Sequence, residues 1–364
     1  MRKNFQGGAM FNVGIIGAGT ISVYHIESYN KLDECRVKAI SDINRNLAEE
    51  RAQKYFIDDV YTDYKELLQD KEIDAVSVAT PTFTHKAIVI DALRAGKHVL
   101  CEKPPAMTAD EVRECKRAAE EEGKLLMFAF VVRFFPFVQD VKKYIEDGKM
   151  GKPLMADCGR TARCFGSQGW FARRELGGGF LRDSAIHELD STLYLMNYPR
   201  PVAVVANQTF ANGDLFERLN GEKSFWASSD TNKYERNVES AIYGFITLDN
   251  GASITVKAAA ILNLIEEGKW IELAGERAGV KIDFAPSDGK KLKFLEITED
   301  FRHSEYAPDT KVGDVYYAEV SHFLDCCKNG RECMCKNEEA VILMEIIEAL
   351  YKSAETGKPV VFEK

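Results

Sequence analysis

The sequence lacks the features that mark several broad classes of protein. It has no low-complexity tract and no apolar run of about 18 residues, the length that a membrane-spanning helix requires. It also has no excess of basic charge, because the formal net charge is -9, whereas phosphate binding requires a basic face. We therefore expect no nucleic acid and no membrane among its partners, and a cytoplasmic location.

A disulfide framework is also missing. The nine cysteines are an odd number, and their spacing is unlike that of a small secreted scaffold. One cluster, Cys326, Cys327, Cys333 and Cys335, surrounds a turn at residues 328–330. Its spacing matches no zinc pattern well, and no histidine follows it. We expect reduced thiols and no metal.

A glycine turn near the start of the chain indicates a nucleotide site. The short apolar run 13–16 ends in Gly17-Ala18-Gly19, with Ser22 where a third glycine is usual. The first glycine allows a tight turn, and the second lets the backbone approach a pyrophosphate. A helix from about residue 21 would direct its amino end at the phosphates. The expected cofactor contacts in this turn are Gly17, Gly19, Thr20 and Ile21.

Asp42 ends the next predicted strand, 36–41, at 23 residues after Gly19. An acidic residue near this separation holds the ribose hydroxyls of a dinucleotide. A carboxylate would repel a 2'-phosphate, which favours NAD over NADP, although Arg45 offers a phosphate partner. The alternative for Asp42 is a helix N-cap, and the two roles are compatible.

The pattern of strands and helices continues to residue 130 and predicts a doubly wound parallel sheet. The predicted strands at 73–78, 98–101 and 125–130 alternate with helices at 85–95 and 108–122, the latter capped by Thr108 with Glu111. Ligands bind at the carboxyl edge of such sheets. For His85 a helix start without a ligand is an equal alternative. The candidate residues at this edge are Thr80, Pro81, His85, Glu102 and Lys103.

The pattern changes after about residue 133, and longer β segments follow residue 191. Asp249-Asn250-Gly251 is a hairpin signal between two of them. We expect an open, mostly antiparallel sheet with helices on one face. Alternating apolar residues at 241–245 suggest that another subunit covers the other face, giving a homodimer or homotetramer. The stretch 211–237 is expected to be a long loop.

A second glycine turn, Gly177-Gly178-Gly179, precedes a helix expected to begin at about Asp183. Asp183 and His187 are spaced i, i+4, so they share a helix face away from the apolar stripe. A histidine titrates near neutrality, as general acid–base chemistry requires. The alternative is an N-capping aspartate beside a solvated histidine. Together with Lys103 and the first glycine turn, this motif indicates a nicotinamide-dependent oxidoreductase.

From about residue 11 to the end, the sequence resembles the Gfo/Idh/MocA family of oxidoreductases. Ser22 is the one noticeable departure in the core motifs. The residues that carry the resemblance are Gly17-Ala18-Gly19 with Thr20-Ile21 and His25, Asp42, Thr80-Pro81 with His85, Glu102-Lys103-Pro104, Arg133-Phe134 with Pro136, Gly177-Gly178-Gly179 with Asp183, His187 and Asp190, and Tyr351, Ser353 and Ala354.

The resemblance implies a Rossmann domain followed by a substrate-binding and oligomerisation α/β domain. We expect a leader or cloning remnant at 1–9 and domains at 10–132 and 133–364, with the C-terminal helix and strand packing back on the first domain. It also implies NAD(P)-dependent oxidation of a secondary hydroxyl on a sugar, cyclitol or related polyol. Lys103 would hydrogen-bond the reacting oxygen, His187 would transfer the proton, and Asp183 would position the substrate; which of Lys103 and His187 is the base stays open.

Polar and aromatic residues between 160 and 174 are the expected substrate contacts. Arg160 and Trp170 lead this set, and Trp170 suits either stacking on a sugar face or core packing. The arginines suit a polar substrate but equally a solvated loop. The other members are Arg163, Phe171, Arg173 and Arg174.

Three alternative functions remain on the sequence alone. One is an enzyme of the same superfamily that reduces a non-sugar ring, as diol dehydrogenases and biliverdin reductases do. Another is an enzyme without net redox change that retains its NAD, as a glycosidase acting through transient oxidation does. The third is a ligand-sensing protein that kept the fold without catalysis, which the presence of Lys103 and His187 disfavours.

Overall fold

The computed structural model describes residues 10–163, 169–211 and 236–363. The expected leader 1–9 and nearly all of the expected loop 211–237 lie outside them. The chain divides into two compact units, Met1–Val131 with Asp314–Val341 and Val132–Gly313 with Ile342–Lys364. Among the described residues, no helix combines the length and apolarity needed to cross a membrane.

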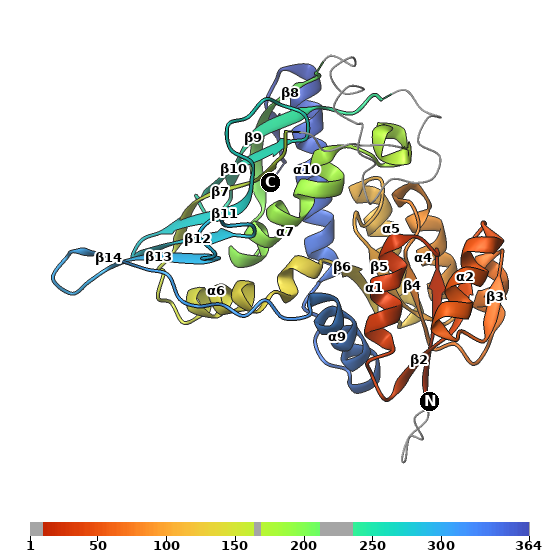
Figure 1. Cartoon of the computed structure of the whole chain (residues 1–364). Coiled ribbons are helices and arrows are strands. Elements are labelled where there is room, and N and C mark those ends of the chain that lie inside the picture. Colours follow the sequence, from red (N-terminus) through yellow and green to blue (C-terminus); the bar gives the residue numbers. More distant parts are fainter. Residues whose placement is uncertain (1–9, 164–168, 212–235, 364) are drawn as a thin grey trace. The chain divides into compact units, whose positions relative to one another are not determined.

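The first unit contains a parallel sheet of six strands in the order β3-β2-β1-β4-β5-β6 (Figure 1). This order confirms the predicted doubly wound sheet, and it reverses between β1 and β4, where such sheets bind ligands. The three-residue strand β3 was not predicted, since so short a segment carries no periodicity. The strands are β1 (Phe11–Ile16), β2 (Cys35–Ser41), β3 (Asp59–Tyr61), β4 (Ala75–Val78), β5 (His98–Glu102) and β6 (Leu126–Ala129).

Local signals account for the helices between these strands. Asn44 accepts a hydrogen bond from the Leu47 N–H and caps α2. Thr108 accepts one from the Glu111 N–H at 3.2 Å, which confirms the predicted cap. The Glu111 carboxylate reaches the N–H of Met107, one residue earlier than in the usual capping box. The helices are α1 (Thr20–Tyr29), α2 (Arg45–Tyr55), α3 (Tyr64–Gln69), α4 (His85–Arg94) and α5 (Ala109–Glu122).

A late segment of the chain completes the first unit. Helix α9 (Val315–Asn329) packs along α1 (Figure 1). The rings of Tyr24 and Tyr316 stack with centroids 4.6 Å apart, and Lys31 forms an ion pair with Asp314. The C-terminal part of the chain that belongs to the first unit is therefore α9 with the start of α10 (Asn337–Thr356).

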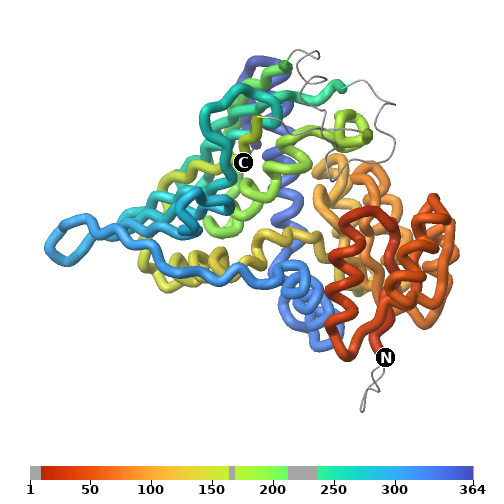
Figure 2. The backbone as a smooth tube through the Cα atoms, viewed as in Figure 1, coloured from red at the N-terminus to blue at the C-terminus, as the bar shows by residue number. Residues whose placement is uncertain are grey.

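The second unit contains a nine-stranded sheet in the order β14-β13-β12-β11-β7-β10-β9-β8-β15. All its pairs are antiparallel except β7 with β10, which confirms the predicted, mostly antiparallel sheet. The β13–β14 hairpin extends away from the rest of the sheet (Figure 2). The strands are β7 (Pro153–Thr161), β8 (Pro201–Thr209), β9 (Ala241–Leu248), β10 (Ser253–Ala259), β11 (Gly268–Gly275), β12 (Ala278–Asp283), β13 (Leu292–Ile297), β14 (His303–Tyr306) and β15 (Val360–Val361).

The two faces of this sheet differ. Helices α7 (Ile186–Leu195) and α10 contact one face, where Gly244 leaves room for Leu350. The other face exposes apolar side chains of three strands, among them Met155, Val205 and Phe245. Cover by a second subunit stays a prediction. The hairpin between β9 and β10 is confirmed, with Gly251 at a φ of 84°.

Candidate functional site

The first glycine turn joins β1 to α1. Gly17 has a φ of +99°, and a Cβ there would collide with the backbone carbonyl of Ala79. A Cβ on Gly19 would meet no atom within 4 Å. Gly17 is therefore required by the fold, whereas Gly19 faces open space at the amino end of α1. No side chain caps this end, so its N–H groups suit a phosphate ligand. Thr20 and Ile21 begin the helix, and the buried Ser22 hydroxyl donates to the Gly19 carbonyl at 2.7 Å.

Asp42 follows β2 and points back at the same turn. One carboxylate oxygen accepts from the Ala18 N–H at 2.7 Å, and the other accepts from the Asn44 N–H at 2.7 Å. The N-cap of α2 is Asn44, so the N-cap alternative for Asp42 is wrong. Arg45, the possible phosphate partner, is ion-paired with Glu49 at 2.7 Å. Asp42 retains lone pairs for a ribose hydroxyl, since each carboxylate oxygen accepts more than one hydrogen bond.

Lys103 follows directly on β5, as predicted, at the carboxyl edge of the sheet. His85 begins α4, is buried, and lies with Nε2 at 2.8 Å from the Thr80 carbonyl oxygen and Nδ1 at 2.8 Å from that of Pro104. Burial lowers the pKa of His85, although its two carbonyl contacts oppose the shift. His85 thus ties the turn after β4 (Thr80-Pro81) to the turn that carries Lys103.

A buried polar chain supports this edge from inside the unit, and sequence reasoning missed it. The Glu102 carboxylate accepts from His25 Nε2 at 2.9 Å and from the Lys103 N–H at 3.1 Å. His25 Nδ1 lies 3.2 Å from the Ser77 hydroxyl, which lies 2.9 Å from the Tyr29 hydroxyl. With the proton on Nε2, Ser77 donates to His25 and Tyr29 donates to Ser77. Glu102 is therefore oriented from within and holds the backbone of Lys103.

Glu319, on α9, is a second buried carboxyl of the first unit. It is fully buried, and neither oxygen has a hydrogen-bond partner among the described residues. Burial raises the pKa of Glu319 well above its ordinary value, and the charge of Glu102 adds to the shift. Glu319 is consequently held as the neutral acid near the Glu102 carboxylate.

In the second unit, Asp183 and His187 span the junction of a π-helical turn, η5 (Leu181–Ala185), with α7. The helix begins earlier than the expected Asp183. In a π turn the hydrogen bonds run from i to i+5, and such turns are frequent at functional sites. Residues four or five apart share a face there, so Asp183 and His187 remain neighbours along the helix. Arg160, on β7, donates to the Ser184 carbonyl of this turn at 3.1 Å.

The second glycine turn is filled by protein groups. A Cβ on Gly178 would collide with the Phe171 carbonyl, and one on Gly179, at a φ of +122°, would lie 2.5 Å from the Tyr351 hydroxyl. The fully buried Glu239 accepts from the Leu181 N–H at 3.1 Å and from the Tyr351 hydroxyl at 2.9 Å. Its carboxylate thus accepts a hydrogen bond from a backbone N–H at the start of the helix, which has no partner within the helix. No motif in the sequence pointed to Glu239.

Helix α7 is fixed by a buried ion pair. Arg133 contacts the Asp190 carboxylate through Nε at 3.0 Å and through a terminal nitrogen at 2.6 Å. Both side chains are buried, and the Tyr198 hydroxyl contacts each of them. A two-pronged pair of this kind sets the position of the helix that carries His187.

The remaining candidate substrate contacts are engaged within the unit. Trp170 is half-buried and stacks on Phe171 with centroids 3.7 Å apart. Arg163 donates to the Leu264 carbonyl at 2.7 Å, Arg173 pairs with Glu175, and Arg174 pairs with Glu355. A substrate role for these residues stays a prediction, and Arg160 is the one tied directly to the turn of Asp183.

Comparison with known proteins identifies the family of the two domains. Residues 11–130 match the model of an oxidoreductase family with an NAD-binding Rossmann fold, and residues 142–362 match the C-terminal α/β domain of that family. D-glucoside 3-dehydrogenase of Escherichia coli is 28% identical over 98% of each chain. Levoglucosan dehydrogenase of Pseudarthrobacter phenanthrenivorans is 32% identical over 80% of this chain and 78% of its own.

Solved structures show the same fold. A levoglucosan dehydrogenase in complex with NADH superposes with a TM-score of 0.83 at 22% identity, over 97% of this chain and 99% of its own. An aldose-aldose oxidoreductase from Caulobacter crescentus gives a TM-score of 0.79 at 22% identity over 97% and 100%. The chain belongs to the Gfo/Idh/MocA family of oxidoreductases, and its cofactor is NAD.

Proposed function

We propose that the protein is an NAD(H)-dependent dehydrogenase that interconverts a secondary hydroxyl and a ketone on a sugar or cyclitol. The observation that carries the proposal is the position of Lys103, directly after β5 at the carboxyl edge of the NAD-binding domain. Relatives over most of the chain are named for glucoside, levoglucosan and scyllo-inositol dehydrogenation, which supports this substrate class.

The residues that hold the cofactor follow from the first glycine turn. The open space at Gly19 and the uncapped start of α1 accommodate a pyrophosphate. Asp42 would receive the ribose hydroxyls and disfavour a 2'-phosphate, so NAD is preferred over NADP. The remaining proposed contacts are Thr20, Ile21, Thr80, Pro81, His85 and Glu102.

In this proposal the chain supplies one cation and one acid–base group. Lys103 donates a hydrogen bond to the reacting oxygen and favours its alkoxide form. His187 takes the hydroxyl proton during oxidation and returns it during reduction. Asp183 accepts hydrogen bonds from hydroxyls of the substrate and fixes its orientation. The bound nicotinamide supplies the hydride acceptor or donor.

The test is the absorbance of reduced nicotinamide with NAD⁺ or NADP⁺, over a panel of glucosides, anhydrosugars, inositols and sugar acids. We expect substrate-dependent reduction with NAD⁺, and losses in kcat/KM of roughly 100-fold or more for Lys103→Met and for His187→Asn. Matched controls are Lys54→Met on α2 and His303→Asn on the exposed strand β14, which should leave the rate unchanged.

Two results would overturn the proposal. If Lys103→Met and His187→Asn both still reduce NAD⁺ at the parent rate, neither residue takes part in the reaction. Turnover of a glycoside without net reduction, with NAD retained through purification, would establish the retained-cofactor alternative.

A further inference from the structure

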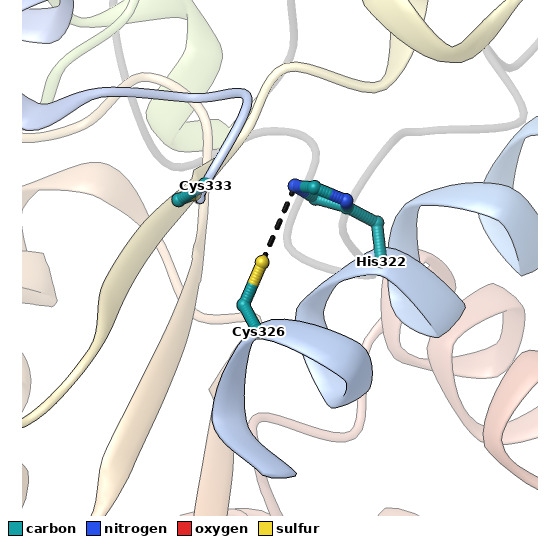
Figure 3. A group of neighbouring side chains, drawn as sticks. All are labelled: His322, Cys326 and Cys333. Carbon is teal, nitrogen blue, oxygen red and sulfur yellow. Dashed lines mark hydrogen bonds between the residues drawn. The ribbon is translucent and has the colours of Figure 1, made fainter. Parts of the chain in front are cut away.

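Three metal-ligating side chains converge at the end of α9, in the first unit. His322 and Cys326 lie one turn apart on the helix, and Cys333 comes from the segment that follows it (Figure 3). Their nearest ligand atoms all lie within 4.8 Å of one another. His322 Nε2 is 3.4 Å from the Cys326 sulfur. The helical spacing i, i+4 explains the first pair, because such residues share a face.

These distances can be compared with the demands of zinc. Tetrahedral Zn²⁺ holds sulfur at about 2.3 Å and imidazole nitrogen at about 2.0–2.1 Å, so its ligand atoms lie roughly 3.5–3.8 Å apart. The separation between His322 and Cys326 already falls near this range. Cys333 lies outside any helix or strand and is half-buried, so rotation of its side chain can close the remaining gap.

The hydrogen bonds of these side chains show which atoms a metal ion would have to compete for. The Met334 N–H donates to His322 Nε2 at 2.9 Å, so this nitrogen presents its lone pair rather than a proton. A bound cation would take that lone pair in place of the Met334 N–H. The Cys333 thiol contacts the Cys335 carbonyl at 3.3 Å and would lose that contact on ionisation.

We propose that His322, Cys326 and Cys333 bind one Zn²⁺ ion, with solvent as the fourth ligand. Binding two thiols releases two protons, so the metal is held as a bis-thiolate, mono-imidazole complex with no change in oxidation state. Histidine and thiolate are the donors that zinc prefers, and three of them leave one coordination position open.

The position of the cluster separates it from the cofactor site. Lys328, two residues after Cys326, pairs with Glu34 at 3.0 Å, and Glu34 directly precedes β2. The end of α9 therefore lies at the amino edge of the parallel strands, opposite the edge of Gly19, Asp42 and Lys103. The ion would fasten the end of α9 to the segment leading into α10, and it would take no part in hydride transfer. This inference does not rest on the proposed function.

The first test measures metal content on the full chain, purified without an affinity tag. We expect one zinc per chain by elemental analysis after equilibration with zinc and removal of the excess. Replacement by Co²⁺ should produce a thiolate-to-cobalt charge-transfer band. Cys326→Ser, Cys333→Ser and His322→Gln should each lower zinc affinity at least about 10-fold, because even a lost outer-shell partner costs roughly 10- to 100-fold.

Cys327→Ser is the matched control, since it alters the neighbouring thiol outside the set and should retain one zinc. Zinc should also raise the unfolding temperature of the parent chain but not of Cys326→Ser.

The proposal is overturned if the parent chain holds no stoichiometric zinc, or if cobalt binds without a charge-transfer band. It is equally overturned if Cys326→Ser and Cys333→Ser bind zinc as the parent does. A Cys326–Cys333 disulfide under reducing purification, seen as two thiols resistant to alkylation, would also exclude the site. The cobalt spectrum needs only the parent chain, so the test stands even if a variant fails to fold.

Discussion

The two glycine turns of the molecule look alike in sequence and differ in what fills them. Both precede a helix that carries candidate site residues. At Gly19 a side chain would enter open space, whereas at Gly179 it would enter protein. The first turn leaves free space beside Gly19, whereas the second is filled by the fold itself, through Glu239 and Tyr351. A glycine motif therefore predicts that another group comes close to the backbone, but it does not predict whether that group is a ligand or part of the protein.

The largest effect is expected at the buried pair that fixes α7, the helix that follows the second turn. Arg133→Met should lower the free energy of unfolding of the second unit by about 3–5 kcal/mol, since it leaves the Asp190 carboxylate buried without its cation. Urea unfolding measures the change. Arg133→Met combined with Asp190→Leu should recover much of the loss; a double variant as unstable as the single one would contradict the charge-based explanation.

Gly179→Ala should cost roughly 2–4 kcal/mol, because it combines a left-handed φ with a clash against the Tyr351 hydroxyl. Gly289→Ala is the matched control: its φ is +76°, but a Cβ there meets nothing within 4 Å. It should cost only the backbone strain, about 1 kcal/mol. Equal unfolding midpoints for the two variants would show that packing plays no part at Gly179.

In the first unit, Glu319→Gln should stabilise the fold at neutral pH by about 1 kcal/mol or more. The raised pKa means that the folded state holds a proton that the unfolded chain loses above the ordinary pKa of 4.5. The contribution of Glu319 to the free energy of unfolding is therefore greatest below pH 4.5. It decreases as the pH rises towards the pKa of Glu319 in the folded state.

The amide needs no proton, so the decline should be absent in Glu319→Gln. Urea unfolding over a pH series in both proteins checks the sign. A steeper decline in the variant would show that Glu319 is ionised in the folded state.

Gly19→Ala should have the smallest effect on stability, within about 0.5 kcal/mol, because its φ of -66° suits alanine and its Cβ meets nothing. Its NAD⁺ affinity should nevertheless fall at least 10-fold or so, since the backbone must approach a pyrophosphate there. Titration calorimetry and thermal unfolding of one preparation give both values. Unchanged NAD⁺ affinity would show that the open space beside Gly19 is not occupied by the cofactor.

The parts of the site that were predictable from the sequence are local. The turn at Gly17 and Gly19, the position of Lys103 after a strand and the cap at Thr108 each depend on residues within a few positions. Glu239 lies 58 positions from the Leu181 N–H that it satisfies, so no local pattern could reveal it. Strand β14 was missed because all four of its residues are exposed, and it therefore shows no alternation.

The cysteine cluster has its histidine on the N-terminal side, since His322 precedes Cys326 by four residues. That spacing is visible in the sequence once the segment is taken as a helix. The position of Cys333 near them depends on the turn that follows the helix, and no periodicity in the sequence specifies the conformation of that turn.

The parallel pairing of β7 with β10 has a consequence for synthesis of the chain. Strand β7 lies between β10 and β11, and Met155 pairs with Ser253 and Ala274. During translation both edges of β7 therefore stay unpaired while roughly 100 more residues are added, about 5–20 s at usual elongation rates. Exposed strand edges recruit other chains. Strand β7, at the centre of the finished sheet, is thus open to aggregation at both edges during this interval.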